Sequence, residues 1–282
     1  MEKHIAGKNV YITGGSSGIG LSAAKQLAAL GANILIFART KERLEAAAAE
    51  IRKSCLSETQ RVSSLQVDVG DNDSVNRVMA RAVQEFGPPD LLINCAGRAY
   101  PHYFEQISYE QFDQTMKTNL YGIWNTTAAL VPEMKKKGGC IVNVSSIAGF
   151  IGIFGYTAYC ASKFGVIGFS EALRSELRSH GIKVAVLCPP DTDTPGFAAE
   201  NKTKPEETKE ASKGAKLMSP DEVARQLIIG RKKDRFLIIP GLDGKITWRI
   251  KRFFPALVDA VLNRQIEKVQ KRLQGAHTEV RS

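Results

Sequence analysis

Short apolar runs alternate along this chain with longer segments in which apolar positions recur every three or four residues. The runs have the length and composition of buried strands, and they lie at residues 8–13, 33–38, 64–69, 90–94 and 139–146. Helical periodicity is clearest at residues 18–27, 71–86 and 159–180. Buried strands that alternate with helices indicate a parallel sheet covered on both faces. We therefore predict an α/β fold with a doubly wound parallel sheet over residues 1–240.

A glycine-rich turn joins the first predicted strand to the first predicted helix. It contains Gly14, Gly15, Ser16, Ser17, Gly18, Ile19 and Gly20. Glycines let a backbone approach a phosphate closely, and the free amides at the start of a helix point at it. The Gly-x3-Gly-x-Gly spacing is one residue longer than the usual dinucleotide fingerprint, so Ser16 and Ser17 can add hydroxyl donors. We predict that the turn binds the pyrophosphate of a dinucleotide; the alternative is a purely structural turn.

The second predicted strand ends where a Rossmann-type sheet meets the adenosine ribose of its cofactor. An acidic residue at that place accepts from the 2'-hydroxyl of NAD, but this chain has Ala38 and then Arg39. Arg39 offers a planar fork of donors to a 2'-phosphate, and Arg43 follows one helical turn later. We therefore predict NADPH as the cofactor. The alternative is that both arginines are ordinary solvated residues at a helix start.

Ligands of such sheets bind beyond the carboxyl ends of the strands. The next two strands end in residues that would line the same crevice, namely Asp68, Val69, Asn94, Ala96 and Gly97. Asp68 can accept from an adenine amino group, although capping of the following helix is an equally good interpretation.

Three residues with proton-transfer chemistry follow in the second half of the chain. Ser146 ends a predicted strand, and Tyr159 and Lys163 share one face of a predicted helix. An unperturbed phenol titrates near ~10, and we expect the Lys163 cation to lower the pKa of Tyr159 enough for proton exchange near neutral pH. Ser146 would donate to a substrate carbonyl oxygen, with neighbouring Ser145 pointing away. Asn119 would hold a water that links Lys163 to solvent, or it is a buried structural residue.

These motifs, in this order, resemble the short-chain dehydrogenase/reductase superfamily over residues 8–240. A second stretch, Pro189-Pro190-Asp191-Thr192-Asp193-Thr194-Pro195-Gly196-Phe197, resembles the 3-ketodihydrosphingosine reductases, which reduce the ketone of a long-chain base with NADPH. The resemblance implies that Tyr159 is the general acid/base, that Lys163 tunes it and holds the nicotinamide ribose, and that Ser146 orients the ketone. It also places Thr194 near the nicotinamide amide.

The implied substrate is a long-chain lipid ketone, 3-ketosphinganine. Alternatives are another lipid, steroid or acyl-chain ketone, or a protein that binds NADP without turnover, although the complete Ser146, Tyr159 and Lys163 set argues against the last. The charged segment 198–215 predicts a mobile helical lid on the substrate side.

Composition agrees with one globular unit without a metal centre. A chain of 282 residues with 43% hydrophobic content can bury a full core. Its five cysteines are odd in number and lack the spacing of metal ligands, as in a reduced cytoplasmic protein. No run reaches the roughly eighteen apolar residues of a membrane span, and the first strand starts too early for a secretory signal. We also expect a homo-oligomer.

The basic character of the chain is concentrated at its end. Residues 231–282 contain 13 Lys/Arg against 5 Asp/Glu, and the formal net charge of the whole chain is +10. No recognition motif or stacking platform accompanies these charges, so nucleic-acid binding is not expected. Residues 241–282 instead predict an amphipathic extension, with a helix break or start at Pro255. Its apolar stripe packs on the protein, or lies on the anionic cytoplasmic face of a membrane.

Overall fold

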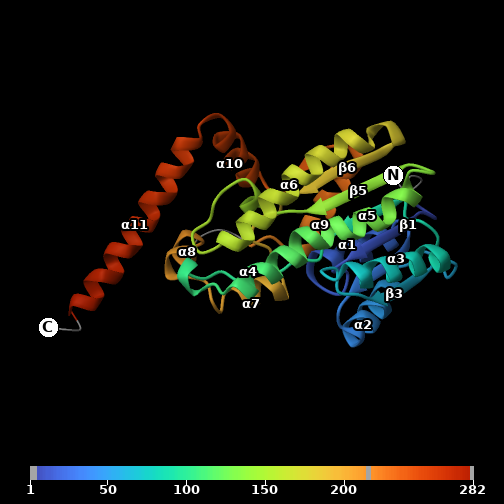
Figure 1. The fold of residues 1–282 in the computed structure, drawn as a ribbon, viewed down its shortest axis with the longest axis horizontal. Coiled ribbons are helices and arrows are strands. Elements are labelled where there is room, and N and C mark those ends of the chain that lie inside the picture. Colours follow the sequence, from blue (N-terminus) through green and yellow to red (C-terminus); the bar gives the residue numbers. More distant parts are fainter. Residues whose placement is uncertain (1–4, 214–216, 280–282) are drawn as a thin grey trace.

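The structure is a computed structural model that describes residues 5–213 and 217–279. Seven parallel strands form one sheet in the order β3-β2-β1-β4-β5-β6-β7 (Figure 1). The strands are β1 (Asn9–Thr13), β2 (Asn33–Ala38), β3 (Val62–Gln66), β4 (Leu91–Asn94), β5 (Gly139–Val144), β6 (Ile182–Leu187) and β7 (Leu237–Ile238). The strand order reverses between β1 and β4, which opens a crevice beyond their carboxyl ends. The predicted doubly wound α/β fold is confirmed.

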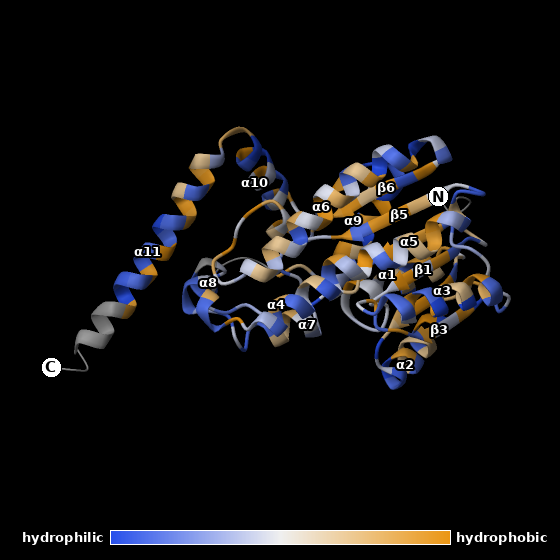
Figure 2. Cartoon of the chain, in the orientation of Figure 1, coloured by the Kyte–Doolittle hydropathy of each residue, from blue (hydrophilic) through white to orange (hydrophobic). Residues whose placement is uncertain are grey.

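Alternation along the central strands separates two hydrophobic cores. Val10 and Ile12 face a core closed by α1 (Gly18–Ala28), α2 (Lys41–Arg52) and α9 (Pro220–Lys232). Tyr11, between them, faces the opposite core, closed by α3 (Asn72–Phe86), α5 (Gly122–Met134) and α6 (Thr157–Leu177). Successive strand residues point to opposite faces, so strands covered on both sides are apolar throughout. Figure 2 shows these apolar strands between helices of mixed character.

The third strand lies two residues earlier than its hydrophobic pattern indicates. It pairs with β2 only as far as the Ala38–Gln66 pair, because β2 ends there. Val67 and Val69 are nevertheless buried, which explains why residues 64–69 have the pattern of a strand. The residue that caps α3 is Asp71, whose side chain accepts from the Ser74 amide. Helix capping by Asp68 is therefore wrong.

Further helices lie beyond the carboxyl edge of the sheet. They are α4 (Tyr109–Met116), the π-helical η3 (Lys117–Tyr121), α7 (Pro195–Glu200), α8 (Glu206–Ala211), α10 (Leu242–Phe253) and α11 (Pro255–Glu279), with 3₁₀ turns at η2 (Phe104–Gln106) and η4 (Ile147–Gly149). A third 3₁₀ turn, η5 (Arg178–His180), lies at the opposite edge, where α6 leads into β6. The helical part of the predicted lid is present as α7 and α8. Pro255 begins α11, which contacts α8 and α10 and then extends away from the sheet (Figure 1).

Candidate active site

The glycine-rich turn is held by its own close packing. Gly14 has a φ of +67°, and a Cβ there would lie 2.8 Å from the Ala96 amide nitrogen. A Cβ at Gly20 would collide with the carbonyl oxygen of Gly14. The Thr13 hydroxyl accepts from the Ala96 amide at 3.2 Å, which joins the turn to the loop after β4. These glycines therefore meet a structural need, and the same contacts bring the turn and Ala96 to the floor of one crevice.

The first turn of α1 is open to an anion. Ser17 occupies the N-cap position, but its side chain makes no capping hydrogen bond, and no acidic residue lies in the first turn. Helix N-terminal amides without a side-chain cap attract negative charge. The partly exposed Ser16 and the exposed Ser17 add hydroxyl donors beside Gly18 and Ile19. The residues present therefore fit the phosphates of a dinucleotide.

Arg39 and Arg43 are exposed at the rim of this crevice. The Arg39 guanidinium lies 4.0 Å from the Asp68 carboxylate, with both side chains more than half exposed. Asp68 also accepts from the Gly70 amide at 2.9 Å, which fixes the loop after β3. An exposed pair of this kind adds little stability, so the Arg39 fork can turn to another anion.

Two predicted crevice residues have buried side chains instead. Asn94 donates to Asn143 at 2.9 Å and accepts from the Thr126 hydroxyl at 2.7 Å. The Val69 side chain is buried in the core against Gly122. A Cβ added to Gly122 would lie only 2.6 Å from the Val69 side chain. Any contact of these two residues with a cofactor would have to use the backbone. Gly97 remains at the crevice, close to the Lys163 ammonium.

Ser146, Tyr159 and Lys163 are brought together at the carboxyl end of β5. Ser146 and Tyr159 line one pocket with Thr194, whose hydroxyl caps α7 by accepting from Phe197. The side chain of Lys163 is only 3% exposed, donates to the Val144 carbonyl at 2.9 Å, and lies 5.5 Å from the centre of the Tyr159 ring. Ser145 points away, because its buried hydroxyl donates to the Lys163 carbonyl at 2.9 Å.

The electrostatics of this set differ from expectation at Tyr159. Burial raises the pKa of Tyr159, the Glu200 carboxylate adds to the rise, and the Ser146 hydroxyl offsets only part of it. Burial lowers the pKa of Lys163 to about 8, against the influence of Cys95, Cys188 and Glu200. The expected lowering of the Tyr159 pKa is therefore wrong, because desolvation of the phenolate is the largest effect. A protonated phenol is the form that a general acid requires.

Asn119 is fully buried in the π-helical segment η3. Its side-chain oxygen accepts from the Arg98 amide at 2.8 Å, and its nitrogen donates to the Arg98 carbonyl at 2.9 Å and to Ser162 at 3.0 Å. This pattern matches the structural alternative for Asn119. A Cβ built on Gly97 would nonetheless lie 3.5 Å from both the Asn119 oxygen and the Lys163 ammonium. One small polar molecule can therefore reach both groups.

The pocket beside Ser146 and Tyr159 measures about 180 Å³. Three charged residues that sequence reasoning did not assign to the site line it, namely Asp191, Glu200 and Lys204. They come from the loop after β6, the end of α7 and the loop before α8. The loop after β6 was notable in the sequence for its double proline, Pro189-Pro190, but nothing in the local pattern shows that these charges line a pocket with Tyr159.

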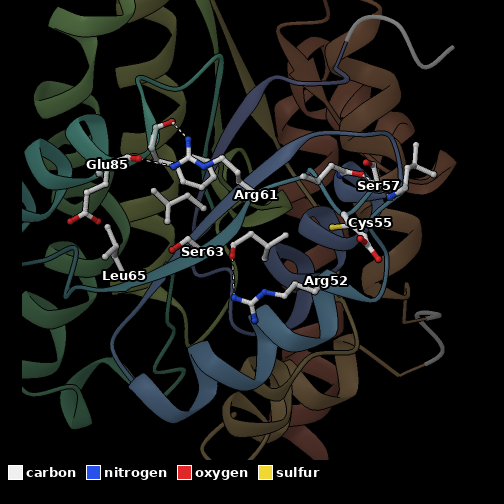
Figure 3. Close-up of a pocket in the computed structure, with 14 residues that line it drawn as sticks. Arg52, Cys55, Ser57, Arg61, Ser63, Leu65 and Glu85 are labelled. Atoms are coloured by element: carbon white, nitrogen blue, oxygen red, sulfur yellow. Dashed lines mark hydrogen bonds between the residues drawn. The ribbon is translucent and has the colours of Figure 1, made fainter.

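A larger cavity of about 760 Å³ lies elsewhere, beside the edge strand β3 (Figure 3). Its two arginines already bind backbone carbonyls: Arg61 donates to Glu85 and Phe86, and Arg52 donates to Val62 at 3.1 Å. None of the candidate catalytic or cofactor residues lines it. Its size therefore does not make it the active site.

The chain is similar to proteins of known family. The sequence model of the family described as short chain dehydrogenase matches residues 8–205. A Danio rerio protein named 3-dehydrosphinganine reductase is 42% identical over 240 residues, which cover 84% of this chain and 72% of that protein. A Bos taurus protein named 3-ketodihydrosphingosine reductase is 40% identical over 242 residues, which cover 85% of this chain and 73% of that protein.

A similar fold is present in a solved structure. The crystal structure of a short chain dehydrogenase/reductase from Burkholderia phymatum in complex with NAD superposes with a TM-score of 0.79 at 23% identity, covering 91% of this chain and 96% of that one. The family match, the sheet order and the Ser146, Tyr159 and Lys163 arrangement agree. The chain belongs to the short-chain dehydrogenase family, whose fold binds a nicotinamide dinucleotide, and it is an oxidoreductase.

Proposed function

We propose that this protein reduces the keto group of 3-ketosphinganine to sphinganine with NADPH. The observation that carries the proposal is the pocket in which Ser146 and the protonated Tyr159 lie together, in a chain about 40% identical to proteins named for this reaction. When bound, NADPH supplies the hydride. The open start of α1 would hold its pyrophosphate, and Arg39 with Arg43 would bind its 2'-phosphate.

The protein's own part in the reaction would be to orient the ketone and deliver a proton. The Ser146 hydroxyl would donate to the carbonyl oxygen and stabilise the charge that develops there. Tyr159 would then give its phenolic proton to that oxygen. Lys163 and Asn119 would together hold a water molecule beside Gly97, whose position lies close to both side chains. Through this water the Tyr159 phenol would regain a proton from solvent.

The dimensions of the pocket support a substrate with a small reactive head. About 180 Å³ is below the roughly 300–1,000 Å³ of sites that enclose a drug-sized ligand. A keto group and its immediate neighbours fit, whereas a long alkyl chain has to leave the pocket. Part of such a substrate would therefore stay in contact with the protein surface or with lipid.

We further propose that the protein meets its substrate at an anionic membrane surface through α10 and α11. Phe253 and Phe254 are 70% and 65% exposed, and Leu257 and Val261 continue the apolar face on α11. Cations flank these residues in the sequence, namely Arg249, Lys251, Arg252, Arg264 and Lys268, of which Lys251 is paired with Asp259. Other positions of the stripe, Val258 and Val269, are buried, so the extension both packs on the protein and presents an apolar face. In the described residues, no helix is long and apolar enough to span a bilayer.

The substrate assignment is tested by following NADPH oxidation with purified full-length protein. The panel consists of 3-ketosphinganine, a steroid ketone and a short acyl ketone at equal concentrations. We expect kcat/KM to be highest for 3-ketosphinganine. A higher value for either of the other ketones would overturn the assignment while leaving the reductase chemistry in place, and NADPH binding without oxidation of any ketone would favour a non-catalytic protein.

A further inference from the structure

Three charged side chains line the active-site pocket without a part in the proton transfer described above. Glu200 accepts from the Tyr156 hydroxyl at 2.9 Å, and the Tyr156 ring lies 5.7 Å from that of Tyr159, centre to centre. The carboxylate of Asp191 receives no hydrogen bond or ion pair from any described residue. A charged group this close to the reacting phenol needs an explanation in the chemistry of the substrate.

Lys204 is the only cation among the residues that line this pocket, and it is not paired with either carboxylate. Its side chain is 5% exposed, and its ammonium lies 4.2 Å from the centre of the Phe197 ring and 5.9 Å from that of Tyr156. Within the described part of the chain, no carboxylate lies at ion-pair distance from it. Aromatic faces attract a cation but do not replace a hydrogen-bond acceptor. The ammonium therefore balances at most one of the two carboxylates, and only through space.

Among the described residues, neither carboxylate has a cation at ion-pair distance, and the ammonium groups of Lys204 and Lys163 act on them only through space. Burial raises the pKa of Asp191 and of Glu200, and the Asp191 carboxylate adds to the rise at Glu200. Glu200 is near enough to raise the pKa of both Tyr159 and Lys163. An uncompensated buried carboxylate is costly, and a cation on the bound substrate would remove that cost. Both carboxylates line the same pocket as Ser146 and Tyr159, which would hold the ketone.

We propose that Glu200 and Asp191 bind a protonated amine on the carbon adjacent to the keto carbon of the substrate, and so select an α-amino ketone over a neutral ketone. The inference rests on the proposed function and names the subsite that would recognise the amine of its substrate. In 3-ketosphinganine the amine is one carbon away from the keto group that Ser146 and Tyr159 would hold. An α-amino group titrates near about 8, so it is largely protonated at neutral pH.

The preference for an amino ketone over a neutral ketone follows from whether the bound substrate provides a partner for the two carboxylates. An ammonium donates charge-assisted hydrogen bonds to the two carboxylates. A ketone of the same length without the amine leaves both partly buried carboxylates without a cation at hydrogen-bond distance. Tyr156 has a positioning role, because its hydroxyl fixes one oxygen of Glu200. Sites built to pair a substrate group reject analogues that lack it more strongly than apolar pockets reject a change of shape.

The experiment compares 3-ketosphinganine with its desamino analogue 1-hydroxyoctadecan-3-one, using NADPH at pH 7. The protein variants are wild type, Glu200→Gln, Asp191→Asn and the control Glu206→Gln, which removes an exposed carboxylate that pairs with Lys209 outside the pocket. Gln at position 200 keeps an acceptor for Tyr156. We expect the preference in kcat/KM for the amino substrate to fall about 10- to 100-fold in each pocket variant and to stay unchanged in Glu206→Gln.

A second measurement needs only the wild-type protein and so does not depend on folding of the variants. Sphinganine should inhibit at a concentration at least about tenfold lower than octadecane-1,3-diol, which lacks the amine. Equal inhibition, or equal loss of kcat/KM for both ketones in Glu200→Gln, would overturn the amine subsite. Those results would leave the proposed reductase intact, whereas a wild-type protein that reduces neither ketone would overturn both.

Discussion

Tyr159 and Lys163 have opposite electrostatic responses to the same burial. The phenol is held protonated, while the pKa of the ammonium falls to about 8. Desolvation disfavours the charged form of each group, which is the phenolate in one and the ammonium in the other. The pair therefore begins a reduction with a proton on the residue that would donate it.

Removal of the phenolic hydroxyl tests this role. In Tyr159→Phe we expect the kcat for ketone reduction to fall by about 10²- to 10⁴-fold, because a positioned general acid contributes on that scale. NADPH binding, followed by the change in nicotinamide fluorescence, should remain. The control is Tyr109→Phe, which changes an exposed tyrosine on α4. Turnover near that of wild type in Tyr159→Phe would show that the proton comes from another group.

The pH dependence of reduction should report Lys163. Its cationic form is present below a pKa of about 8 and is lost above it. Since reduction consumes a proton and Lys163 would be protonated while it supports Tyr159, kcat/KM should fall as the pH rises through about 8. Initial rates from pH 6 to 10 test this, with NADPH affinity measured at each pH as the control. A rate that stays constant to pH 10 would contradict the assignment.

Arg39 provides a residue-level test of cofactor choice. Arg39→Asp should lower the ratio of kcat/KM for NADPH to that for NADH by about 10- to 100-fold, because it replaces a charge-assisted bond to the 2'-phosphate with repulsion. Arg77→Asp, on the exposed face of α3, makes the same change in net charge away from the crevice. The assignment fails if the ratio is unchanged or if both variants shift it equally.

At the level of elements, the site depends on how strand ends are joined to helices. Thr13 links the end of β1 to the loop after β4. Asn94 links β4 to β5 through Asn143 and to α5 through Thr126, and Asn143 donates onward to Ser170 on α6. A fully satisfied polar network of this kind holds neighbouring elements in one arrangement. The buried residues of this network hold in place the strand ends on which the site is built.

A variant of Asn94 distinguishes a structural role of this side chain from a role in cofactor binding. Asn94→Ala should lower the free energy of unfolding by about 1–3 kcal/mol, because buried partners lose their hydrogen bonds. Urea unfolding measures the change, and the exposed Asn76→Ala on α3 is the control. Unaltered stability together with weaker NADPH binding would show instead that the Asn94 side chain serves the cofactor.

At the level of the whole molecule, α10 of the C-terminal extension packs on the α/β domain, and α11 then extends away from it. Gly244 of α10 lies against Ile147 and Ile239, and Trp248 packs against the cluster of Val186, Cys188 and Ile239. The boundary predicted at residues 240 and 241 stays a prediction, but α10 is not a free tail. The exposed face beyond it, formed by Phe253, Phe254, Leu257 and Val261, is available to lipid or to a second copy of the chain, and the expected homo-oligomer also stays a prediction.

Point variants test membrane contact without removing the packed part of α10. Wild-type protein should co-sediment with phosphatidylserine vesicles at low salt, and Phe253→Ser with Phe254→Ser should reduce the partition coefficient at least about 100-fold. Cations near the surface would contribute roughly 1 kcal/mol each, so added salt should weaken binding. Leu56→Ser, exposed in the loop after α2, is the control. If wild type stays in the supernatant and the double variant changes the oligomeric state, the face binds a second copy.

Local sequence determined most of the architecture and the identity of the reactive groups. Buried parallel strands are apolar on both faces, and helices carry one apolar face, so the first five strands and the helices α1, α3 and α6 could be located from their period, whereas β6 and β7 were not predicted. The spacing of Tyr159 and Lys163 follows from one helical turn, and the start of α1 follows from its glycines. Period alone misplaced β3, because Val67 and Val69 are buried although β2 has ended.

Tertiary structure decided the environment of those groups. Ser146 rather than Ser145 faces the pocket because the Ser145 hydroxyl donates to the Lys163 carbonyl of α6. The pKa of Tyr159 depends on how much water its neighbours exclude, and the pocket charges depend on where the loops after β6 and α7 fold back. Burial and charge proximity are sums over residues far apart in the chain, whereas hydrophobic period is a property of neighbours. Most of the central strands and helices could therefore be predicted from the sequence, and the charges around the site required the assembled fold.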